Sequence, residues 1–250
     1  MTGHVTETRG IKIALIGYLI LVVVQLATYY FTGILVLLAQ ALEMLSDVLI
    51  STFLLLSTFL SKKPADEFHM FGHGRAQNVA ALISATILIS FMSIETFREA
   101  IPKFFQTSEA NEFQNINLAL VVILVGMFVV AVPIIDIFRT TAKGASLKAQ
   151  LVALLKDEFS YVVGLIAVVF VGQGYHLADP LASTIVATVI AISGLYLLKD
   201  NVHYLLGRAP SRGFLGKVES VAKSVKGVLG VHDLKAEYVG PNVVHTGFHI

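Results

Sequence analysis

Apolar residues form long, almost uninterrupted runs along this chain, and short polar clusters separate them. A helix needs about 20 mostly apolar residues to cross a lipid bilayer. Six segments approach that length and predict six transmembrane helices: roughly Ile13–Phe31, Ile34–Leu60, Val79–Ile101, Ile116–Phe138, Leu147–Val171 and Pro180–Leu198. We therefore expect an α-helical membrane protein.

The pattern changes after Ala209-Pro210. SRGFLGKVESVAKSVKGV has a helical pattern, and HDLKAEYVG and NVVHTGFHI alternate like strands. We expect a cytoplasmic segment over 1–12, a six-helix domain over 13–208 and a cytoplasmic α+β segment over 209–250. Domains below about 40 residues rarely form a core unaided. Either a partner chain completes this segment, or it is part of a longer domain.

Composition agrees with a membrane protein. The 250 residues are 56% hydrophobic and 14% charged, whereas soluble domains are about a quarter charged. The absence of cysteine excludes disulfides and thiolate metal sites. A net charge of +1 without a basic, aromatic-rich tract argues against a nucleic-acid partner. The lipid bilayer is the expected environment.

Positive charges in the short loops predict the orientation of the chain. The turns at 29–33 and 172–179 contain no Lys or Arg, and the 102–115 loop has only Lys103 against Glu109 and Glu112. The other side is basic: Arg9, Lys12, Lys62, Lys63, Arg75, Arg139, Lys143, Lys148, Lys199 and Arg208. Both termini are therefore expected in the cytoplasm, with the protein in the cell membrane.

Acidic residues occur at matching places in two of the apolar runs. AQALEMLSD contains Glu43 and Asp47, four residues apart on one helix face, and AQLVALLKD ends at Asp157 with Ala153 at the place of Glu43. Buried acids are costly unless a divalent cation or protons neutralise them. Repeated helices that face each other are a known route to a transport site. The alternative is a set of protonated or hydrogen-bonded packing acids.

Other polar residues of these helices have simpler interpretations. We expect Gln40 and Gln150 to form hydrogen bonds between helices. Lys156 and Glu158 flank Asp157 but point about 100° away from it on a helix. They are interpreted as residues that surround the site or line a cavity.

Two polar clusters lie outside the apolar runs. SKKPADEFHMFGHGR supplies Asp66, His69 and His73 at spacings of three and four, which suit a metal such as zinc. Gly72 and Gly74 would let the backbone bend closely around an ion. Ordinary solvated loop residues are the alternative.

The second polar cluster lies in the tail. It contains His232, Asp233, His245 and His249, and alternation places His245 and His249 on one strand face. Ordinary surface histidines are the alternative here.

From its first helix to Ile250 the sequence resembles the cation diffusion facilitator family. SKKPADEFHMFGHGR is similar to the family's S-x-KPAD-x-x-H-x-FGHG-[KR] loop. The tail is similar to the start of the family's ferredoxin-like (metallochaperone-like) cytoplasmic domain. Further marks are Ser46-Asp47, Asp179-Pro180-Leu181-Ala182 and Leu205-Leu206-Gly207-Arg208-Ala209-Pro210. The family's later cytoplasmic ligands have no counterpart, so we expect a truncated or naturally short chain with an incomplete domain.

The resemblance implies three metal sites. Glu43, Asp47 and Asp157 match intramembrane ligands, but Ala153 stands where the family has His or Asp. That leaves three carboxylates and no imidazole. The implied loop and cytoplasmic ligands are Asp66, His69 and His73, and His232 and His249.

The function implied is export of a divalent metal ion, the substrate, in exchange for protons by an alternating-access homodimer. Oxygen ligands favour Mn²⁺ or Fe²⁺ over Zn²⁺, although Gln150, Glu158 or water could complete a zinc shell. The alternative is a transport-impaired regulatory or heterodimeric partner subunit that senses metal through His232 and His249. An intramembrane metallohydrolase is disfavoured because no HExxH motif or Ser-Lys pair accompanies the acids.

Overall fold

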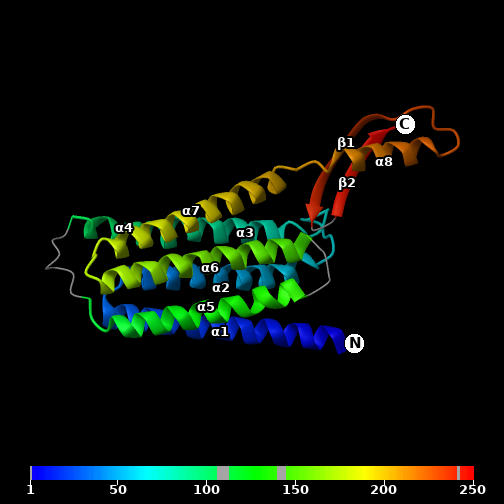
Figure 1. The fold of residues 1–250 in the computed structure, drawn as a ribbon. Helices are drawn as coiled ribbons and strands as arrows, with labels where there is room; N and C mark the ends of the chain where they lie inside the picture. Colours follow the sequence, from blue (N-terminus) through cyan, green and yellow to red (C-terminus); the bar gives the residue numbers. More distant parts are fainter. Residues whose placement is uncertain (1, 106–112, 140–144, 241–242) are drawn as a thin grey trace. The chain divides into compact units, whose positions relative to one another are not determined.

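Long helices followed by a small strand pair make up the chain (Figure 1). The computed structural model describes residues 2–105, 113–139, 145–240 and 243–250. The elements are α1 (Thr2–Thr32), α2 (Leu35–Ser61), α3 (Ala76–Ile87), the π-helix η1 (Leu88–Ser93), α4 (Ile94–Lys103), α5 (Ile116–Arg139), α6 (Ala145–Gly172), α7 (Ala178–Leu205), α8 (Arg212–Lys223), β1 (His232–Gly240) and β2 (Val243–His249). Each predicted apolar segment overlaps a helix, with α3, η1 and α4 following one another without a break.

Four helical segments of the described chain are long and apolar enough to cross a membrane: Leu35–Ser61, Ala76–Lys103, Ile116–Arg139 and Ala178–Leu205. They identify a multi-pass membrane protein. The described apolar part of α1 is the shorter Gly17–Thr32, and α6 carries Lys156, Asp157 and Glu158. Membrane crossing by these two helices, and hence the number six, stays a prediction.

Helix α5 has one buried face and one exposed face, and both carry apolar side chains. Ile123 and Val130 are fully buried, whereas Phe128 is 71% exposed and Val121 57% exposed. A soluble protein rarely leaves a broad apolar face open to water. This face of α5 is therefore suited to contact lipid.

The chain forms two compact units: Met1–Leu49 with Ile87–Gly194, and Ile50–Thr86 with Leu195–Ile250. Within the first unit, α5 packs against α6 and α1. Gly126 makes the approach to α6 possible, because a Cβ atom there would overlap the ring of Tyr161. The predicted domain division at 12/13 and 208/209 stays a prediction.

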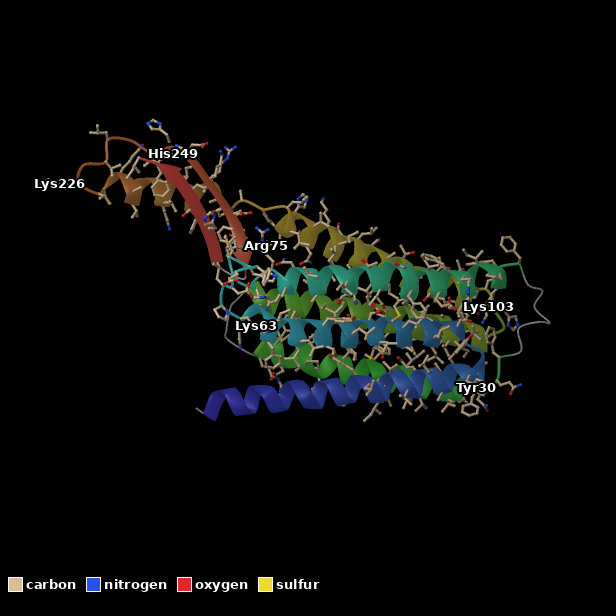
Figure 2. All side chains as sticks on the ribbon, turned by 180° about the vertical axis from the view of Figure 1, so that it is seen from behind. Tyr30, Lys63, Arg75, Lys103, Lys226 and His249 are labelled. Carbon is tan, nitrogen blue, oxygen red and sulfur yellow. The ribbon has the colours of Figure 1, made fainter. Side chains whose placement is uncertain are left out.

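Asp179, at the start of α7, fixes the start of α2. Its Oδ2 and Oδ1 accept hydrogen bonds from the backbone N–H groups of Leu35 and Val36, both at 2.8 Å. These are donors that a helix N-terminus leaves without an intrahelical partner. Lys103, labelled in Figure 2, lies 3.6 Å from Asp179 Oδ2 and donates to Gly33 O at 3.0 Å. Gly33 adopts φ +71°, which favours glycine. The Asp179-Pro180 motif thus positions α2.

The C-terminal elements occur in the predicted order of helix, strand and strand. Ser211 Oγ caps α8 by accepting a hydrogen bond from Phe214 N at 3.3 Å. β1 and β2 pair antiparallel. This observed sheet has two strands, so the full ferredoxin-like arrangement stays a prediction.

Candidate metal sites

Three predicted ligands converge on one point of the first unit. Lys156 Nζ lies 3.3 Å from Glu43 Oε1, 3.6 Å from Asp47 Oδ2 and 3.1 Å from Asp157 Oδ1. Glu43 and Asp47 come from α2, and Asp157 comes from α6. We call these three acids and Lys156 the acid cluster. With all four groups ionised, three negative charges and one positive charge leave a net charge of −2.

The acids of this cluster differ in how far their side chains are exposed to solvent. The side chains of Glu43 and Asp157 are 5% and 11% exposed, whereas that of Asp47 is 32% exposed. Glu43 Oε1 and Asp157 Oδ1 are buried and accept no hydrogen bond from the described residues. A buried charge needs a compensating partner. Here the compensation comes from the ammonium group of Lys156.

Polar contacts hold α2 against α6 beside the acids. Gln40 Nε2 donates to Ser160 O at 2.9 Å, which confirms the predicted interhelical hydrogen bond. A Cβ atom on Gly164 would overlap that amide nitrogen, so the contact requires glycine. The side chain of Gln150, and the loop charges Lys143, Glu109 and Glu112, lie outside the described residues.

Tyr161 forms a second buried link next to the cluster. Its hydroxyl accepts a hydrogen bond from Gln25 Nε2 of α1 at 2.7 Å and lies 3.7 Å from Met44 Sδ of α2. Tyr161 follows Asp157 by one turn, on the same face of α6. The i, i+4 spacing from Asp157 was a signal that could have identified it in the sequence.

Lys156 is the residue that sequence reasoning placed least well. Its Cα–Cβ direction differs from that of Asp157, but its long side chain brings the ammonium group back among the acids. It follows the exposed Ala153 by three residues, which is about one helical turn. A lysine at the centre of an apolar run needs a nearby acid, and that signal was present in the sequence.

The loop residues Asp66, His69 and His73 also come together, and we call them the loop cluster. Their ligand atoms lie within 4.8 Å of one another, the one such group of three among the described residues. Asp66 Oδ1 lies 3.0 Å from His69 Nδ1, Asp66 Oδ2 lies 3.6 Å from His73 Nε2, and the two imidazole centroids are 4.2 Å apart. Carboxylate and imidazole groups this close are suited to a transition-metal ion.

Local backbone geometry assembles the loop cluster. Asp66 Oδ1 accepts hydrogen bonds from Phe68 N at 3.0 Å and His69 N at 2.7 Å. Desolvation raises the pKa of Asp66, but the hydrogen bonds from the His69 side chain and these backbone groups outweigh it and hold the pKa below its usual value. Asp66 is therefore an ionised ligand near neutral pH.

Contacts within the second unit set the loop cluster against β1. A Cβ atom on Gly74 would lie 2.7 Å from Gly240 Cα, so the close approach needs glycine at 74. Arg75, labelled in Figure 2, pairs through Nη2 with Glu237 Oε2 of β1 at 2.7 Å. The predicted role of Gly72 in backbone bending agrees with its φ of +75°.

Of the three tail histidines, two lie opposite each other on the paired strands. His232 lies opposite His249 in the β1–β2 register, whereas His245 lies opposite Glu237. All three histidines lie on this strand pair. Within the part of the chain that is described, no third carboxylate or imidazole completes a compact ligand group with His232 and His249.

Comparison with known proteins places most of the chain in one family. The family described as "Cation efflux transmembrane domain" matches residues 11–206. The chain belongs to the cation diffusion facilitator family. This confirms the resemblance based on the loop motif, and it makes the protein a member of a cation efflux transporter family.

Three relatives match most of the chain. An uncharacterised transporter of Methanocaldococcus jannaschii is 26% identical over 97% of this chain and 84% of its own length. The cation-efflux pump FieF of Yersinia enterocolitica is 28% identical over 89% of this chain and 73% of its own. A "cadmium, cobalt and zinc/H(+)-K(+) antiporter" of Bacillus subtilis is 25% identical over 91% and 74%.

Proposed function

We propose that this cation efflux transporter exports a divalent metal ion from the cytoplasm in exchange for protons, with Glu43, Asp47 and Asp157 as the intramembrane ligands. The observation that carries the proposal is the convergence of three carboxylates from two helices on one point. A divalent cation and protons each neutralise buried carboxylates, so they compete for the site. That competition couples proton entry to metal exit.

The donor set supports a preference for Mn²⁺ or Fe²⁺ over Zn²⁺. All three proposed ligands are carboxylates, and Ala153 supplies no donor atom. Oxygen-rich sites suit harder cations, whereas zinc sites usually include His or Cys. The Bacillus subtilis relative is named for cadmium, cobalt and zinc. This chain would therefore differ from that relative in its metal.

The remaining clusters fit supporting roles on the cytoplasmic side. The loop cluster combines carboxylate and imidazole groups and is proposed to bind a metal such as zinc before or alongside transport. His232 and His249 are proposed as a metal-binding pair of the tail. An isolated two-stranded sheet is marginally stable, which supports a homodimer in which a second copy covers it. Six membrane crossings with both termini in the cytoplasm complete the proposal.

Flux measurements test this proposal. The purified chain in liposomes should take up Mn²⁺ and Fe²⁺ faster than Zn²⁺, with opposite proton movement reported by a trapped pH dye. Asp47→Ala should reduce the flux to the background of empty liposomes. Glu95→Gln is the matched control, because Glu95 is a helix acid paired at 2.6 Å with exposed Arg98. Equal flux through wild type and Asp47→Ala would show that the site is not used.

Two observations favour a second function, that of a transport-impaired partner subunit. Ala153 removes one expected ligand, and Lys156 occupies the space between the other three. A regulatory subunit would show background flux alone but would change the metal response of another family member in the same liposomes. A flux that depends on Asp47 would reject this alternative.

A further inference from the structure

The geometry points to Lys156 as a tethered competitor of the transported ion: its ammonium group occupies the acid cluster, and a divalent cation binds only when that group withdraws. The inference rests on the proposed function, because it assigns a selectivity role at the same site. Lys156 Nζ lies within 3.6 Å of one oxygen from each acid. The ammonium group thus lies between the three acids, whose oxygens would have to move closer together to hold one metal ion, since they do not form a compact ligand group as they stand.

Space is the first argument. Metal–carboxylate bonds are about 2.0–2.2 Å long, so one ion bound to all three acids would have to lie between them, where Lys156 Nζ now lies. A metal ion and an ammonium group placed side by side between the same three acids would repel each other strongly, because the site is shielded from water. The metal and the ammonium group therefore exclude each other.

Unfilled bonding capacity is the second argument. Glu43 Oε1 and Asp157 Oδ1 are buried oxygens that accept no hydrogen bond from described residues. These same atoms lie nearest to Lys156 Nζ, at 3.3 and 3.1 Å. Lys156 is the cation that compensates both oxygens, so a metal ion could take over that role once the ammonium group has left.

The lysine side chain has a route out of the cluster. It is 21% exposed, and its flexible four-carbon stem can carry the charged end toward water. Asp47, the most exposed of the three acids, lies 3.6 Å from the ammonium group. Withdrawal needs a change of side-chain rotamers and no change in the charge of Lys156.

Competition of this kind would select cations by charge. A monovalent ion that replaces the ammonium group brings the same single positive charge, so it gains nothing to offset the loss of its hydration. A divalent ion brings one more positive charge than the ammonium group that it replaces. With all three acids ionised, the net charge of the site therefore falls from −2 to −1. Lys156 would thereby exclude Na⁺ and K⁺, and its return would help release the divalent ion after transport.

Lys156→Gln tests the inference in the full-length protein. We expect the half-saturating Mn²⁺ concentration to fall by about tenfold or more, on the scale measured for close charge pairs. The maximal flux should fall too, because release slows, and K⁺ should now inhibit Mn²⁺ binding measured by titration calorimetry. Lys156→Arg keeps the charge and should remain insensitive to K⁺. Lys199→Gln removes an exposed lysine at the end of α7 and should change none of these values.

A second pair of variants covers the case in which Lys156→Gln does not fold. Glu43→Gln combined with Lys156→Gln leaves two carboxylates and no ammonium group, which keeps the net charge of −2. This double variant should bind Mn²⁺ more tightly than Glu43→Gln alone. Equal or weaker binding would overturn the inference, as would an unchanged Mn²⁺ affinity and K⁺ response in a folded Lys156→Gln protein.

The two proposals fail in different ways. If wild type and Asp47→Ala carry the same flux, the transport proposal fails regardless of Lys156. If Asp47→Ala abolishes flux but Lys156→Gln neither tightens Mn²⁺ binding nor admits K⁺, only the competitor role fails. Lys156 would then be a structural counter-charge.

Discussion

The acid cluster and the loop cluster hold similar numbers of candidate ligands but are assembled by opposite means. Asp66, His69 and His73 lie within eight consecutive residues, and backbone hydrogen bonds orient Asp66 directly. Glu43 and Asp157 are separated by more than one hundred residues and meet only because α2 packs on α6. The loop cluster is a local structure, whereas the acid cluster is a product of the tertiary fold.

This difference extends to charge. The side chain of Asp66 is 47% exposed, so water can stabilise its charge, and imidazoles contribute further ligands. Glu43 is 5% exposed and depends on an ammonium group from the neighbouring helix. A metal site exposed to water needs few protein groups to neutralise its charge when no metal is bound, because water stabilises that charge. A buried site of like charges needs a substitute cation, and the substitute then influences which ions can enter.

The largest effect is expected from removing a buried acid. Asp157→Asn keeps the size of the side chain but removes one ligand charge, so flux should fall to the liposome background while Zn²⁺ binding at the loop cluster persists. Flux assays and Zn²⁺ titration measure the two separately. Glu158→Gln changes the adjacent acid, whose Cα–Cβ direction differs by about 100° from that of Asp157, and should retain transport. Loss of transport in both variants would mean that the ligand has been misassigned.

A smaller effect is expected from disturbing the helix contact that brings the acids together. Gly164→Ala would push its Cβ atom into Gln40 Nε2 and should cost about 1–3 kcal/mol of stability, as overpacking does. Thermal unfolding in detergent should show a lower midpoint, together with weaker Mn²⁺ binding. Gly172→Ala on the same helix meets only Ile116 Cγ2 at an ordinary 3.6 Å and serves as the control. Equal midpoints for the two variants would contradict the packing argument.

Sequence patterns predicted local features far better than distant ones. The apolar runs located the long helices, because helix formation in a membrane depends on continuous local hydrophobicity. The hydrogen bonds that Asp179 accepts from the start of α2 join residues 144 and 143 positions apart. The family motif identified Asp179, but no periodicity could predict its partners. The π-helical segment η1 was likewise not predicted.

The same limit applies to the candidate sites. The spacing of Asp66, His69 and His73 sufficed to predict that they could meet, since the turn that joins them is short. Matching positions predicted that Glu43, Asp47 and Asp157 share a region. The position of Lys156 was interpreted from its backbone direction alone, which is inadequate for a side chain this long.

Removing an imidazole should alter the loop cluster and spare the acid cluster. His73→Ala should weaken Zn²⁺ binding by at least the roughly 10–100-fold that loss of a ligand's outer partner costs. Flux of Mn²⁺ at saturating concentration should change little. His203→Ala alters a histidine of α7 outside the cluster and provides the control. If His73→Ala stops Mn²⁺ flux as fully as Asp157→Asn, the two clusters are not separate in function.

The smallest effect should come from the ion pair that borders the loop cluster. Arg75 and Glu237 are 2.7 Å apart but 39% and 36% exposed, so solvent screens their attraction. A double-mutant cycle with Arg75→Gln and Glu237→Gln should give a coupling energy of about 0.2–1 kcal/mol by thermal or chemical unfolding. The Glu219–Lys223 pair on α8, also 2.7 Å apart, is an exposed reference. The Arg75–Glu237 pair joins the loop to β1, so its removal should also weaken Zn²⁺ binding slightly, an effect that removal of the α8 pair cannot have. If both cycles leave Zn²⁺ affinity unchanged, Asp66, His69 and His73 are held by their own turn alone, and the contrast with the acid cluster becomes sharper.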